Sequence, residues 1–201
     1  MSQEKQGNST DILTRTVYKI GTLLSNNSSN IESKLQKFVD AFNSKFPETD
    51  AKNRSGAEVI TWALMDTPLI LYALNLNGSM MIELHGILER FAVRETIDHL
   101  TTPANRKIAS GLLERSTLRD VVRVLQQLGI FDKEDIKFTE KLTAIRNGVA
   151  HKNPRNISKM LLSEKEISFL DIESAMKNVD CIPLIVGTIH LLVKMLEVKL
   201  K

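Results

Sequence analysis

Apolar residues recur at spacings of three and four along most of the chain, and the alternating pattern of strands is nearly absent. Leu35, Phe38 and Phe42, for example, share one face of a predicted helix over about 31–46, which Pro47 closes. The same periodicity predicts further helices over about 11–24, 79–99 and from 132 to about 146, and over 58–74 with a break and restart at Pro68. The predicted fold class is therefore all-α.

Capping residues mark several helix ends. Thr102-Pro103 resembles an N-cap followed by proline at the first helical position. Thr117 with Asp120 three residues later predicts a capping box, and Gly129 is a typical helix stop. These signals predict two more helices between 102 and 129.

Two other segments are informative about organisation. The polar stretch 47–57 predicts an exposed loop or linker after the first helices. A capping pattern at Ser163 predicts a helical region from there to the C-terminus, with a restart at Pro183. The chain shows no internal repeat, zinc-ligand pattern or phosphate-binding glycine loop.

Composition favours a folded intracellular protein. With 201 residues and 42% hydrophobic content, the chain can bury a core without disulfides. Cys181 is the single cysteine and no signal segment opens the chain, so we expect a cytoplasmic location. The most apolar stretch, 181–193, is too short to cross a bilayer, and no membrane association is expected. A net charge of +3 permits an RNA partner without arguing for one.

The stretch from Arg146 to His151 is where the sequence offers chemistry. The arginine and the histidine are five positions apart, and Asn147 follows the arginine directly. A guanidinium group binds phosphate bidentately, and an imidazole with a pKa of about 6.5 exchanges protons near neutrality. This pair suits phosphate chemistry and needs no metal ion or cofactor.

Arg146-Asn147-x-x-x-His151 near a helix end of an all-α chain resembles the motif of the HEPN superfamily, an arginine followed after four to six residues by a histidine. The resemblance extends over residues 78–201 and implies a bundle of four to five core helices. Residues 1–77 would be an N-terminal helical extension or part of the same domain. The family likeness also implies a homodimer in which motifs of two subunits face one cleft.

The resemblance further implies a metal-independent endoribonuclease, with a toxin–antitoxin or antiviral defence role. His151 would then act as acid or base around the ribose 2′-hydroxyl, and Arg146 would hold the scissile phosphate. Asn147 would orient His151 or the substrate. An acidic residue on the preceding long helix often joins such sites, and Glu83 is preferred here over Glu89. A separate antitoxin or regulatory protein would be a further partner.

Lys152, Arg155 and Lys159 follow the motif and could form a basic rim for RNA, although they could equally be ordinary surface charges. The other histidines have a different expected role. For His85, His99 and His190, positions beside apolar stripes or helix ends favour core or capping roles over chemistry.

Two alternatives remain open on the sequence. A non-catalytic module of the same fold could bind RNA, a nucleotide or a protein partner through the same groove. An unrelated helical scaffold is also compatible, because Asn147-Gly148 could be a helix stop with Arg146 as a cation near the negative end of the helix dipole.

Overall fold

The computed structural model describes residues 16, 18–22, 28–113, 115–151, 176 and 179–198. Within these ranges every regular element is a helix, which confirms the all-α prediction. The helices are α2 (Ser28–Lys45), α3 (Ala51–Leu64), α4 (Asp66–Ala73), α5 (Asn77–Leu100), α6 (Arg106–Leu113), α7 (Leu118–Gln127), α8 (Lys133–Ala150) and α11 (Ile182–Val198).

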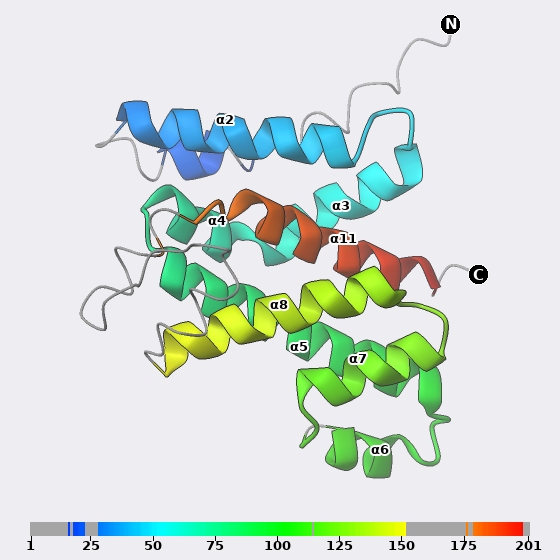
Figure 1. Ribbon diagram of the computed structural model, residues 1–201. Helices are drawn as coiled ribbons and strands as arrows, with labels where there is room; N and C mark the ends of the chain where they lie inside the picture. Colours follow the sequence, from blue (N-terminus) through cyan, green and yellow to red (C-terminus); the bar gives the residue numbers. More distant parts are fainter. Residues whose placement is uncertain are drawn as a thin grey trace, which may run out of the picture.

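Helix α5 is the centre of the arrangement (Figure 1). It contacts α4, α6, α7, α8 and α11, while α11 also packs against α2 and α3. Buried side chains from α2 to α11, such as Phe38, Leu88 and Leu192, belong to one continuous hydrophobic cluster. Helices on both sides of residue 77 therefore share this core. No helix in the described part of the chain is long and apolar enough to cross a membrane.

The loop expected over 47–57 is shorter than the sequence predicted. Helix α3 already begins at Ala51, where the Asp50 side chain accepts hydrogen bonds from the backbone N–H and the side-chain amide of Asn53, at 3.4 and 2.7 Å. Arg54, in the first turns of this helix, is buried. Residues 47–52 and Ser55 are exposed, as expected, but the segment is helical from Ala51 on, and its polar residues include a cap and a buried charge.

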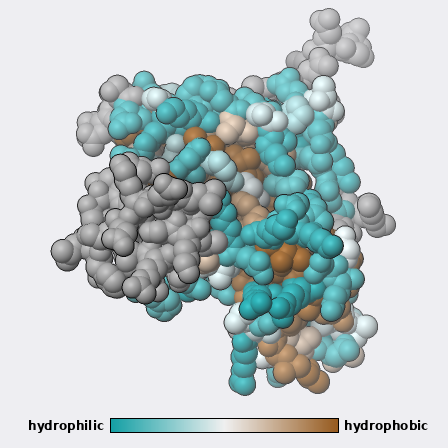
Figure 2. Space-filling view, in the orientation of Figure 1, coloured by the Kyte–Doolittle hydropathy of each residue, from teal (hydrophilic) through white to brown (hydrophobic). Residues whose placement is uncertain are grey.

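The helix expected from Thr102-Pro103 begins later, at Arg106. The Thr102 carbonyl accepts hydrogen bonds from the N–H groups of Asn105 (3.2 Å) and Arg106 (3.1 Å), so the segment first forms a turn. Helix α6 buries none of its residues, and Ile108 and Leu112 are 69% and 68% exposed. Figure 2 shows hydrophobic residues at the lower end of the molecule, where Figure 1 places α6.

The capping box at Thr117 and Asp120 is confirmed, and Gly129 ends its helix with a φ of 72°. Asp132, the N-cap of α8, forms a second capping box with Asp135. Lys194 of α11 donates to both carboxylates, at 3.0 and 2.7 Å. The backbone N–H of Asp135 and the Lys194 ammonium lower the pKa of Asp132 to about 2. These contacts fix the start of α8. Because α8 is one continuous helix, they also help to position its C-terminal end.

Helix α11 begins at Ile182, directly after Cys181, in agreement with the expected restart at Pro183. The Cys181 carbonyl accepts hydrogen bonds from the N–H groups of Leu184 and Ile185, both at 3.1 Å. The Cys181 side chain is fully buried, and burial together with the neighbouring Asp180 charge raises the pKa of its thiol to about 12. The capping pattern at Ser163 lies outside the described residues.

Candidate functional site

The three motif residues lie at the C-terminal end of α8. This helix continues through Asn147 and Gly148 to Ala150, and His151 is its C-cap, with its backbone N–H donating to the Asn147 carbonyl at 3.0 Å. The alternative of a helix stop at Asn147-Gly148 is therefore wrong. Gly148 is buried inside the helix and Gly129, not Gly148, has the left-handed conformation. The helix places Arg146 just before its last turn and Asn147 in that turn, and it exposes His151 just beyond its end.

Asn147 is a direct partner of the arginine. Arg146 Nη1 donates to Asn147 Oδ1 at 2.9 Å, and both residues are half-buried. Asn147 also lines a cavity of about 310 Å³ between α7 and α8, together with Arg119 and Arg123. The amide therefore restrains the guanidinium while other N–H groups of Arg146 keep their donor capacity.

Helix α5 contributes a histidine, His85, on which the Arg146 charge acts, and an acid, Glu89, next to that histidine. His85 Nδ1 lies 3.9 Å from Glu89 Oε2, and the imidazole is almost fully buried. Burial lowers the pKa of His85; the Glu89 charge opposes this shift and the nearby Arg146 charge adds to it. His85 Nε2 has no hydrogen-bond partner among the described residues. We call His85, Glu89, Arg146 and Asn147 the α5–α8 cluster.

His151 does not join this cluster through a hydrogen bond. Neither a hydrogen bond nor an ion pair connects its side chain to Arg146, and both residues are in the described part of the chain. At about 100° per residue, positions five apart lie about 140° apart around a helix. A phosphate held by both side chains of one subunit would thus have to bridge two faces of the helix end.

Glu83 lies on α5 and is half-buried. It makes no hydrogen bond or ion pair with Arg146, Asn147 or His151, whereas Glu89 is the acid next to His85. Lys152, Arg155 and Lys159 lie outside the described residues. The structure thus pairs Arg146 with Asn147, its neighbour in the sequence, and places Glu89 next to His85, the histidine on which the Arg146 charge acts.

The part played by His85 was not foreseen in the sequence. Its burial agrees with the expected core role, but its unpaired nitrogen and its proximity to Arg146 do not follow from that role. The spacing of His85 and Glu89, four residues apart on a predicted helix, was the available signal. The pairing of α5 with α8, which brings Arg146 to them, is a long-range contact that no local pattern encodes.

The described residues contain no group of three or more His, Cys, Asp or Glu side chains close enough to hold a metal ion. Comparisons with known protein families, with characterised proteins and with solved structures gave no match. The functional argument therefore rests on the site itself.

Proposed function

We propose that this protein is a metal-independent endoribonuclease of HEPN type that acts in a toxin–antitoxin or antiviral setting. The observation that carries the proposal is the grouping of Arg146, Asn147 and His151 at one helix end, with the guanidinium restrained by Asn147 and the imidazole exposed to solvent. A restrained cation and an exposed acid–base group are the two functions that RNA transesterification requires.

In the proposed reaction, His151 takes the proton from a ribose 2′-hydroxyl, and the 2′-oxygen attacks the adjacent phosphorus. The bond from phosphorus to the 5′-oxygen breaks, and that oxygen accepts a proton from an imidazolium. The products are a 2′,3′-cyclic phosphate and a 5′-hydroxyl. Arg146 binds the non-bridging phosphate oxygens and stabilises the charge that develops on them.

A homodimer explains how both side chains reach one phosphate. Because Arg146 and His151 lie about 140° apart around α8, a single subunit presents them to different sides. Two copies related by a twofold axis at this helix end would supply the arginine of one subunit and the histidine of the other. We therefore propose a composite site, with a separate antitoxin as a further partner.

The test is cleavage of a mixed RNA pool in EDTA by the purified protein and by Arg146→Ala and His151→Ala variants. Lys141→Ala is the matched control, since Lys141 is exposed on the same helix. We expect cyclic-phosphate ends from the wild type and the control, and a loss of at least about 100-fold in rate for the other two. Equal activity in all four proteins would refute the assignment.

A second function, RNA binding without cleavage, is favoured by the missing contact between Arg146 and His151. In that case the wild type leaves the RNA pool intact but retains it, and His151→Ala binds as the wild type does. The same set of variants, measured for binding as well as cleavage, separates the two functions.

A further inference from the structure

A cavity of about 1030 Å³ lies between the C-terminal half of α5 and α6. It is separate from the smaller cavity between α7 and α8, and its volume is at the upper end of the range for small-molecule sites. We call it the α5–α6 groove. A space of this size accommodates a short single strand of nucleic acid and is too small for a duplex.

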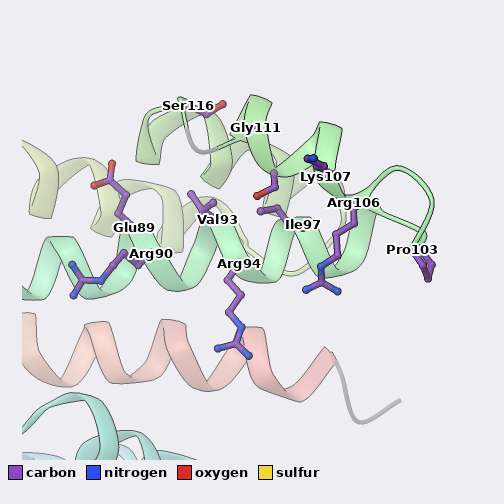
Figure 3. A pocket seen from close by; sticks show the side chains of 11 residues that line it. Glu89, Arg90, Val93, Arg94, Ile97, Pro103, Arg106, Lys107, Gly111 and Ser116 are labelled. Atoms are coloured by element: carbon purple, nitrogen blue, oxygen red, sulfur yellow. The ribbon is translucent and has the colours of Figure 1, made fainter.

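Four cationic side chains line the α5–α6 groove, namely Arg90 and Arg94 of α5 and Arg106 and Lys107 of α6. Among the described residues that line the groove, Glu89 is the one acid; Glu114 lies outside the described residues. Figure 3 shows Arg90 and Arg106 extending beside α5, whereas the Arg94 guanidinium extends away from α6 toward α11. Positive charge therefore exceeds negative charge along the groove, even though Arg106 is also paired with Asp98.

The geometry of these cations suits a repeating anion. Arg90 and Arg94 are exposed and lie four residues apart, which corresponds to an axial separation of about 6 Å. That rise separates the Cα atoms and is comparable to the spacing of successive phosphates in an extended strand. The guanidinium groups extend in different directions, with Arg90 Nη1 beside Gly86, and would have to turn to meet two such phosphates. Each guanidinium can bind a phosphate bidentately.

The groove also has an apolar part. Val93 and Ile97, one helical turn apart on α5, line it between the charged residues. Bases can pack against such side chains, and they also stack on the planar guanidinium groups of arginines. An acidic peptide would use the cations, but its carboxylate side chains have no flat rings to stack on this surface. The combination favours a nucleic acid strand.

Glu89 connects the groove to the α5–α8 cluster. Its carboxylate lines the groove and lies 3.9 Å from His85, the residue on which the Arg146 charge acts. Figure 3 shows Glu89 extending from α5 away from the Arg94 guanidinium. Of the residues that line the groove, Glu89 is the nearest to His85 along α5.

We propose that the α5–α6 groove binds single-stranded RNA, holding the nucleotides that flank the bond presented at the end of α8. The choice of RNA as the strand rests on the proposed function. Arg90 and Arg94 contact successive phosphates, and Val93 and Ile97 pack against the bases. The groove is a binding site, and its residues take no part in the chemical step.

The test measures binding of a fluorescent single-stranded RNA of mixed sequence by anisotropy, in EDTA, at several salt concentrations. The RNA carries 2′-O-methyl groups, so cleavage cannot occur. We expect Arg90→Ala/Arg94→Ala to weaken binding by roughly tenfold for each lost charged contact. The slope of log affinity against log salt should fall in magnitude by about 0.7 per lost phosphate contact.

Lys52→Ala is the matched control, because Lys52 is exposed on α3, which packs against α11 and α4. It should change neither the affinity nor the slope. The wild type should also prefer the RNA strand to poly-glutamate of equal charge. Unchanged binding by the double variant, or equal binding of poly-glutamate, would overturn the proposal.

The two proposals fail separately. If RNA binding depends on the groove but unmodified RNA is not cleaved, the proposal for the groove stands and the proposed endoribonuclease activity is refuted. If cleavage depends on Arg146 and His151 but Arg90→Ala/Arg94→Ala binds RNA as the wild type does, the proposed activity stands and the proposal for the groove is refuted.

Discussion

The burial of His85 makes the stability of the folded protein depend on pH. Its imidazole is almost fully buried, and its pKa in the folded protein is lowered, mainly by burial. Above the ordinary value of about 6.5 the group is neutral whether the chain is folded or not. Below that value the unfolded chain takes up a proton more readily than the folded one, so acid destabilises the fold.

We therefore expect the free energy of unfolding to fall as the pH is lowered from 7 to 5, and to fall less steeply in His85→Gln. One such histidine contributes a slope of at most about 1.4 kcal/mol per pH unit. Urea titrations at several pH values measure this slope. The pKa of His190 is also lowered by burial, so His190 accounts for part of the pH slope that remains in His85→Gln. The variant His190→Gln tests this contribution. Parallel profiles for wild type and His85→Gln would contradict the interpretation.

Arg54 shows the opposite case, a buried charge that is fully paired. It donates to Glu58 Oε1 at 3.0 Å, to the Phe46 carbonyl at 2.8 Å and to Asn43 Oδ1 at 3.2 Å. Both Arg54 and Glu58 are buried. These bonds join the end of α2 to the start of α3.

Replacing Arg54 by Met leaves the Glu58 carboxyl group buried without its partner. We expect a loss of about 3–5 kcal/mol in the free energy of unfolding, measured by chemical denaturation. The double variant Arg54→Met/Glu58→Met should recover much of this loss, since no charge then remains buried. A double variant as unstable as the single one would mean that packing, not charge, sets the effect.

At the scale of helices, the contact between α8 and α11 depends on the absence of one side chain. A Cβ atom on Gly187 of α11 would lie 2.4 Å from the Phe138 ring of α8. The two helices approach closely at this point, and Lys194 fixes their relative position further along by pairing with Asp132 and Asp135. Helix α8 thereby holds its other end, with Arg146, against α5.

Gly187→Ala should destabilise the protein by about 1–3 kcal/mol, because the Phe138 ring must move to admit the methyl group. Gly56→Ala is a matched control in α3, where the added Cβ meets Val193 at an ordinary 3.8 Å. That substitution should be neutral or stabilising by up to about 1 kcal/mol. Thermal unfolding of both variants measures the difference. Equal melting temperatures would show that the ring moves at no cost.

Helix ends were predictable where local side chains determine them. The boxes at Thr117 and Asp120, and the start at Asp132, use partners within three residues. The start of α3 was missed because the polar residues around Arg54 were taken for a loop, although Arg54 is buried by contacts with α2. The effect of the Arg146 charge on His85 was missed for the same reason, since Arg146 is on another helix.

At the scale of the whole molecule, α11 connects the N-terminal helices to the rest. It packs against α2 and α3 on one side and against α5 and α8 on the other, and its side chains belong to the common core. The sequence suggested a division at residue 77, but it could not show how the two parts pack. Continuity of the core predicts that they unfold together.

We expect one cooperative transition for the full chain, with equal calorimetric and van't Hoff enthalpies. Leu192→Ala removes a fully buried side chain of α11 and should lower the free energy of unfolding by about 2–5 kcal/mol. The variant should still unfold in a single transition. Scanning calorimetry and circular dichroism give the comparison. Two resolved transitions in the wild type would contradict a single cooperative unit.

The buried Cys181 can report how often the start of α11 opens. It is the single cysteine of the chain, and a thiol with a pKa of about 12 is almost wholly protonated and unreactive at neutral pH. An alkylating reagent should therefore modify it only when the start of α11 opens. The labelling rate, compared with that of the unfolded chain, then gives the frequency of this opening. The same experiment, repeated with RNA present, shows whether RNA binding slows this opening, and it needs no engineered label.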